Sequence, residues 1–66
     1  MELLTQIDNI NEKIKEKTGL IGAARYQYRN GKCTQIQMMY MVTDLNCQIT
    51  ELYMQRMELI FSSMFD

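Results

Sequence analysis

The sequence predicts an all-α fold, an antiparallel two-helix hairpin that forms a single domain over residues 1–66. Three observations lead to it: the chain has no proline and only three glycines, 47% of its residues are hydrophobic with few β-branched runs, and it contains one strong turn signal, "RNGK" at 29–32. An Asn-Gly pair tolerates positive φ, so it can end one helix and reverse the chain. We expect helix 1 at about 2–29 and helix 2 at about 34–64, with Thr34 as the N-cap of helix 2.

The first predicted helix is apolar on one side only. Its apolar residues recur at alternating spacings of four and three, as in a coiled-coil seam, and Lys17 is the one missed step. Gly19 and Gly22 leave two alternatives, because each costs roughly 1 kcal/mol inside a helix: the helix stops near Thr18, or packing carries it through to Arg29. The pattern keeps its register across residues 19–22, which favours a continuous or kinked helix. The seam consists of Leu3, Ile7, Ile10, Ile14, Ile21, Ala24 and Tyr28.

The second predicted helix has more apolar surface than one neighbouring helix can cover. An inner stripe, expected to face helix 1, consists of Met38, Met41, Val42, Leu45, Ile49, Leu52, Leu59 and Ile60, and Arg56 lies within it. A second stripe consists of Ile36, Met39, Tyr53, Met54, Met57, Phe61, Met64 and Phe65. Because a single hairpin partner buries one stripe, the second predicts an interaction site. The residues expected to bind a partner are Met39, Tyr53, Met54, Met57, Phe61 and Met64.

The size of the chain also favours association. A domain this short buries only about 60% of the surface of its unfolded chain, so natural examples usually add disulfides, a metal or oligomerisation. The chain has no His, and its two cysteines, Cys33 and Cys47, lie 14 residues apart on one predicted helix, too far for a disulfide. Two candidates therefore remain: a homo-oligomer that pairs two hairpins into a four-helix bundle, or a different protein.

Other classes of function are disfavoured by composition. The net charge of −1 gives no electrostatic reason to bind nucleic acid, and no apolar run is long enough for a transmembrane helix. The N-terminus has no basic region of the kind a secretory signal carries, and two unpaired thiols fit a reducing compartment, so we expect a cytoplasmic protein. Without an imidazole base or a plausible pocket for paired acids, we expect no catalytic, cofactor or metal site and no enzyme activity.

The pattern resembles the small co-chaperones of type III secretion needle subunits. The corresponding parts are "MELLTQIDNINEKIKEK…AARYQY", "RNGK" and "TQIQMMYMVTDLNCQITELYMQRMELI". The resemblance covers nearly the full chain as a pattern, without a sharp motif, and the pair Gly19 and Gly22 departs from it. It implies a cytoplasmic hairpin, with a role in secretion and virulence, that binds a helical-repeat co-chaperone and, together with it, keeps the needle subunit monomeric before export. The alternative is a homodimeric helical-bundle protein with a regulatory or structural role and no part in export.

Overall fold

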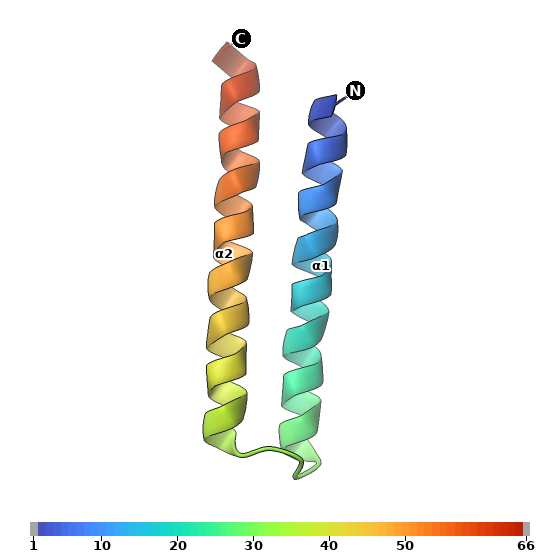
Figure 1. Cartoon of the computed structure of the whole chain (residues 1–66), viewed down its shortest axis with the longest axis vertical. Coiled ribbons are helices and arrows are strands. Elements are labelled where there is room, and N and C mark those ends of the chain that lie inside the picture. Colours follow the sequence, from blue (N-terminus) through green and yellow to red (C-terminus); the bar gives the residue numbers. More distant parts are fainter. Residues whose placement is uncertain (1, 66) are drawn as a thin grey trace.

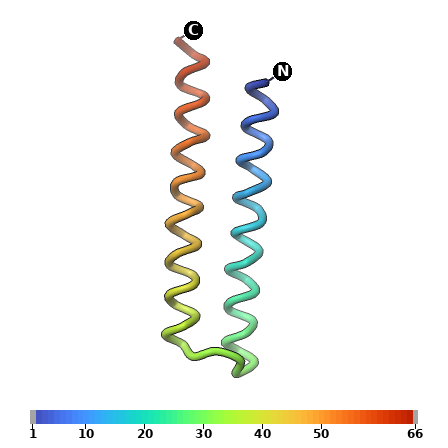
Figure 2. The backbone as a smooth tube through the Cα atoms, viewed as in Figure 1, coloured from blue at the N-terminus to red at the C-terminus, as the bar shows by residue number. Residues whose placement is uncertain are grey.

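The computed structural model describes residues 2–65 and contains two helices, α1 (Glu2–Arg29) and α2 (Gln35–Phe65). The helices pack antiparallel along most of their lengths, with the turn at one end of the molecule (Figure 1). The Cα atoms extend over 51 × 17 × 9 Å, so the hairpin is a single layer of helices, as the backbone tube also shows (Figure 2). The predicted all-α hairpin is confirmed, and most large apolar side chains of α2 are left exposed.

Helix α1 runs without a break through both of its glycines. Of the two alternatives that the sequence leaves open, the structure has the continuous helix. A Cβ atom built on Gly19 or Gly22 would meet no other group within 4 Å, so neither glycine is required by close packing. The adjacent Thr18 hydroxyl donates a hydrogen bond to the Ile14 carbonyl at 2.8 Å, within the same helix. Contacts of the seam with α2 on both sides of the glycines therefore maintain a helix that local propensity alone would weaken.

The turn after α1 is closed by backbone hydrogen bonds. The Lys32 amide donates to the Gln27 carbonyl at 2.9 Å, and the Gly31 amide donates to the Tyr28 carbonyl at 3.1 Å. This pair of bonds, with Gly31 at φ 72°, is the Schellman arrangement that satisfies carbonyls at a helix end. The Asn-Gly signal in the sequence thus marks the reversal, and the glycine supplies the left-handed residue.

Helix α2 begins with a reciprocal cap. The Gln37 amide donates to the Thr34 hydroxyl at 3.1 Å, and the Thr34 amide donates to the Gln37 side-chain carbonyl at 2.9 Å. Both bonds together form a capping box, which satisfies amides that the first turn of a helix leaves without partners. The predicted N-cap role of Thr34 is confirmed, and Gln37 is its partner.

The core between the helices is narrow. Among the described residues, only Ile10, Ala24 and Leu52 are buried, and the other members of the two facing stripes are mostly half-buried. Three residues that the periodicity assigns to these stripes are instead exposed at the margins: Tyr28, Met41 and Ile60. They are exposed because a hairpin of one layer covers only the centre line of each stripe.

Within residues 2–65, hydrogen bonds from Lys17 and from Arg56 cross between the helices. Lys17, the missed step of the α1 seam, donates to the Gln48 side-chain carbonyl at 2.6 Å, and Gln48 in turn donates to Asp44 at 2.9 Å. Further from the turn, Arg56 donates to the Asn11 side-chain carbonyl at 2.6 Å. Arg56 is half-buried, as expected for a side chain that extends along its aliphatic stem from the core. In each contact, the polar residue that interrupts one apolar stripe, Lys17 or Arg56, bonds to a polar side chain of the other helix.

Candidate protein-binding surface

The second stripe lies on the side of α2 that α1 does not cover. All six residues predicted to bind a partner are exposed: Tyr53 at 43%, Phe61 at 52%, Met57 at 54%, Met39 at 55%, Met54 at 57% and Met64 at 70%. Six large apolar side chains on one helix are more than the scattered exposed residues that any soluble protein carries. Whether they bind a partner stays a prediction.

The structure brings five of the six together. Residues 53–64 span three turns of α2, so their members are neighbours on one surface. Met39 lies apart, about 21 Å from Tyr53 along the helix axis at 1.5 Å per residue. It belongs instead to a shallow apolar hollow lined by Ile36, Met39, Tyr40 and Thr43.

Tyr53 stands at the margin of the surface and differs from the other five. The Arg56 guanidinium carbon lies 4.8 Å from the centre of the Tyr53 ring, a cation–π contact. One face of the ring is therefore covered within the chain. Its remaining exposed part still adjoins Met57, one turn further along α2.

Sequence reasoning missed two exposed side chains of this surface as partner-binding residues. Ile36 is 67% exposed and Tyr40 is 74% exposed, and both lie near the start of α2. The signal that reveals them is a heptad spacing, alternating four and three residues from Ile36 to Met64. Nine positions of α2 follow this spacing, and all nine are exposed. We call them the outer seam: Ile36, Tyr40, Thr43, Cys47, Thr50, Met54, Met57, Phe61 and Met64.

The total accessible surface is larger than that of a compact monomer of the same mass. The chain exposes 5384 Å², whereas a compact monomer of 7.9 kDa would expose about 4,400 Å². The difference of about 1,000 Å² is close to the area that one partner contributes to a standard protein interface, about 800 Å². The excess follows from the elongated single-layer shape, which leaves the outward faces of both helices exposed.

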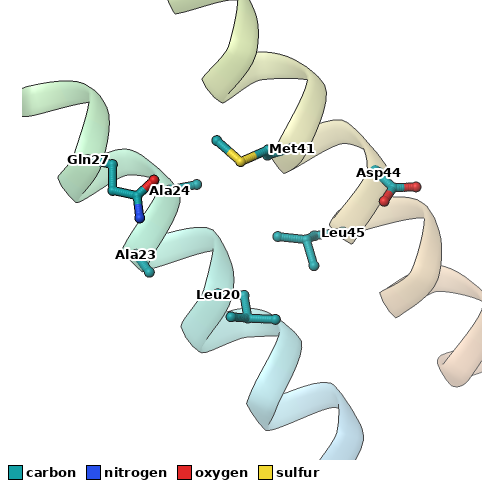
Figure 3. A pocket seen from close by; sticks show the side chains of 7 residues that line it. All are labelled: Leu20, Ala23, Ala24, Gln27, Met41, Asp44 and Leu45. Carbon is teal, nitrogen blue, oxygen red and sulfur yellow. The ribbon is translucent and has the colours of Figure 1, made fainter. Parts of the chain in front are cut away.

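A second hollow lies between the helices near the turn. It is lined by Leu20, Ala23, Ala24 and Gln27 of α1 and by Met41, Asp44 and Leu45 of α2. In Figure 3 the Met41 and Leu45 side chains point toward α1, whereas Asp44 points away from it. The alanines leave the hollow open, and it contains no pair of polar groups that converge on a common point. It is a packing groove at the edge of the core.

Groups capable of chemistry are sparse on this surface. Among residues 2–65, no three His, Cys, Asp or Glu side chains are placed to bind a metal ion. Both thiols are free. Cys33 is half-buried beside the turn and precedes α2, so the prediction that the two cysteines share one helix is wrong, whereas Cys47 is exposed near the centre of the outer seam. Within the same residues, neither helix combines the length and hydropathy needed to cross a membrane.

Comparison with known proteins does not assign the chain to a family. No protein-family model, curated protein or solved structure matches it. The structure itself is a small two-helix hairpin. The apolar surface exposed on one of its helices suggests a binding surface.

Proposed function

We propose that the chain is a small adaptor of the chaperone type, which binds an apolar helical segment of another protein through the second stripe of α2. The observation that carries the proposal is the exposure of the six residues predicted to bind a partner, while α1 covers only the inner stripe. A bound helix would bury these side chains and, at the same time, its own apolar face, so the partner is withheld from aggregation. Catalysis has no part in the proposal.

A more specific form of the proposal follows from the resemblance described above. In it, the chain acts in the cytoplasm as a co-chaperone of a type III secretion needle subunit, and the helical partner is a helical-repeat co-chaperone, the needle subunit or both. A two-helix hairpin of this size with an exposed apolar face on its second helix is compatible with that role.

The second candidate is a homodimer with a structural or regulatory role. Its support is the spacing of the outer seam alone, apart from the charges beside it: heptad spacing over about 42 Å is the pattern that pairs helices into coiled coils. Two hairpins joined along α2 would then form a four-helix bundle.

Sedimentation of the purified full-length chain separates the two candidates. The chain is measured alone over a range of concentrations and again after co-expression with the genes that neighbour its own. A defined complex with one neighbouring product supports the adaptor, and a concentration-dependent dimer of the chain alone supports the second candidate. A monomer at every concentration, with a cooperative melt and no partner, contradicts both.

A substitution at the centre of the exposed cluster tests the surface itself. Met57→Asp introduces a charge among apolar side chains and is expected to weaken association by about 2 kcal/mol or more, roughly 30-fold, as for a hot-spot residue. Tyr26→Asp is the matched control, because Tyr26 is 64% exposed on α1. Both variants should keep their helical circular dichroism. Unchanged association of Met57→Asp would rule out the second stripe as the binding surface.

A further inference from the structure

The outer seam is bounded by two edges that differ in charge. One, the acidic edge, carries one carboxylate per heptad at Asp44, Glu51 and Glu58. The opposite, uncharged edge consists of Met39, Asn46, Tyr53 and Ile60. All seven residues are exposed, and each position flanks the seam as the e and g positions flank a coiled coil. The seam therefore selects a neighbour by charge along one side and by apolar contact along the other.

Few cations of the chain itself are placed to satisfy the acidic edge. Arg56 is the single Lys or Arg of residues 35–65, and it lies on the inner stripe, bound to Asn11 and stacked on Tyr53. From α1, Lys13 and Lys17 border the groove that Glu51 also borders, but Lys17 is engaged by Gln48. Asp44 accepts a hydrogen bond from the neutral Gln48 side chain, but among the described residues no cation pairs with Asp44 or Glu58, so their charge is left for a neighbour.

A second copy of the chain fits this surface poorly. Pairing of two outer seams in antiparallel orientation places acidic edge against acidic edge, and like charges at such positions are destabilising. Parallel pairing places the carboxylates against the apolar side chains of the uncharged edge, which removes water from charges without supplying partners. Helix α1 of a second copy offers no continuous apolar stripe. Its exposed apolar side chains, Leu4, Leu20 and Tyr26, are far apart along the helix, and its outward positions also include Asp8, Glu12 and Lys15.

We infer that the occupant of the outer seam is a basic amphipathic helix of a different protein, about four heptads long. Its apolar positions pack on the nine seam residues, and Lys or Arg side chains beside them face Asp44, Glu51 and Glu58. The inference rests on the proposed function, because it specifies the chemistry of the partner that the same surface binds. It adds that charge, as well as apolar area, decides which helix is accepted.

Two labelled synthetic peptides of 28 residues test the inference on the full chain. Both have Leu at the seam positions and Gln or Ala on the outer face; one has Lys at every flanking position and the other has Glu. Neither peptide pairs readily with itself, because its flanking charges repel. By fluorescence anisotropy at low salt, we expect the Lys peptide to bind about tenfold or more tightly than the Glu peptide. The difference should shrink at high salt, which screens exposed charges.

A charge reversal on the protein supplies the matched comparison. The triple variant Asp44→Lys, Glu51→Lys, Glu58→Lys should prefer the Glu peptide. The control variant Glu2→Lys, Asp8→Lys, Glu12→Lys has the same change in net charge on α1, and should keep the preference for the Lys peptide. All six original side chains are exposed, and circular dichroism checks that both variants remain helical.

The outcomes separate this inference from the proposed function. Equal binding of both peptides, or a preference that reverses in both triple variants, would overturn the charge selection while leaving a surface that binds helices. Failure of the chain to bind either peptide, with or without salt, would count against the helix-binding surface as well. Loss of the preference only when the acidic edge is reversed supports the inference.

Discussion

The outward faces of the two helices differ sharply, although both helices contribute similar stripes to the core. Outward positions of α1 carry mainly charged and amide side chains, together with Gly19 and Gly22, whereas those of α2 carry most of the methionines and both phenylalanines. A helix that only completes a hairpin needs one apolar stripe. The second stripe on α2 is not needed to complete the hairpin, and its contrast with α1 suggests a binding surface.

The largest expected effect on stability comes from truncating an inward-facing residue of α2. Leu52→Ala deletes the most buried side chain of α2 and should lower the free energy of unfolding by about 2–5 kcal/mol. Met57→Ala, on the outward face of the same helix, should change it by no more than about 0.5 kcal/mol. Urea unfolding followed by circular dichroism measures both. Similar losses from the two variants would mean that the outward face is already packed in the isolated chain.

Glycine-to-alanine substitutions should change the stability in opposite directions in the turn and in α1. Gly31→Ala forces an L side chain into a left-handed conformation and should cost about 1–2 kcal/mol. Gly22→Ala, in the middle of α1 with open space around its Cβ position, should stabilise the chain by up to about 1 kcal/mol. Thermal unfolding of the two variants checks the signs. A loss of stability in Gly22→Ala would show that α1 is less helical in solution at this point.

The cap of α2 should contribute a smaller amount. Thr34→Ala removes the hydroxyl that accepts the Gln37 amide and should cost about 1 kcal/mol. Thr34→Ser retains that acceptor and serves as the control. Chemical unfolding of the two variants against the unchanged chain gives the difference, and equal stability of Thr34→Ala and Thr34→Ser would contradict a working capping box.

The two thiols provide a readout of the surface without any substitution. Cys47 lies exposed in the centre of the outer seam, whereas Cys33 is half-buried beside the turn. A bound helix should slow alkylation of Cys47 in proportion to the fraction of chain bound, and leave Cys33 nearly unchanged. Mass spectrometry after timed alkylation follows both sites in one sample. Equal protection of the two would place the partner elsewhere.

Much of this fold can be predicted from the sequence, since the signals are local and agree. The Asn30–Gly31 pair marks the reversal, Thr34 marks the start of α2, and the heptad pattern of α1 places Ile10 and Ala24 on the inward face. The passage of α1 through Gly19 could not be decided in this way, because tertiary contacts outweigh a helix propensity of about 1 kcal/mol.

The degree to which each side chain is buried was harder to predict than the side of the helix on which it lies. Periodicity assigns Met41 and Ile60 to the stripe that faces α1, but it does not say how far a single neighbour reaches around a helix, and both are exposed. The pairing of Lys17 with Gln48 depends on how the turn sets the two helices against each other, which no local pattern encodes. Tyr40 was missed because the stripe was assigned with the 3.6-residue period of a straight helix. A heptad repeat has a period of about 3.5 residues and therefore rotates slowly around the helix.

The hydrogen-bonded turn has a kinetic consequence. Only residues 30–34 separate the helices, and the Schellman bonds and the capping box that flank this segment need no contact from elsewhere in the chain. We expect folding to start there and to proceed outward as successive turns of α1 and α2 meet, and such local contacts form rapidly. If the proposed adaptor role is correct, the chain would meet its partner with its backbone already ordered, so association would lose little conformational entropy.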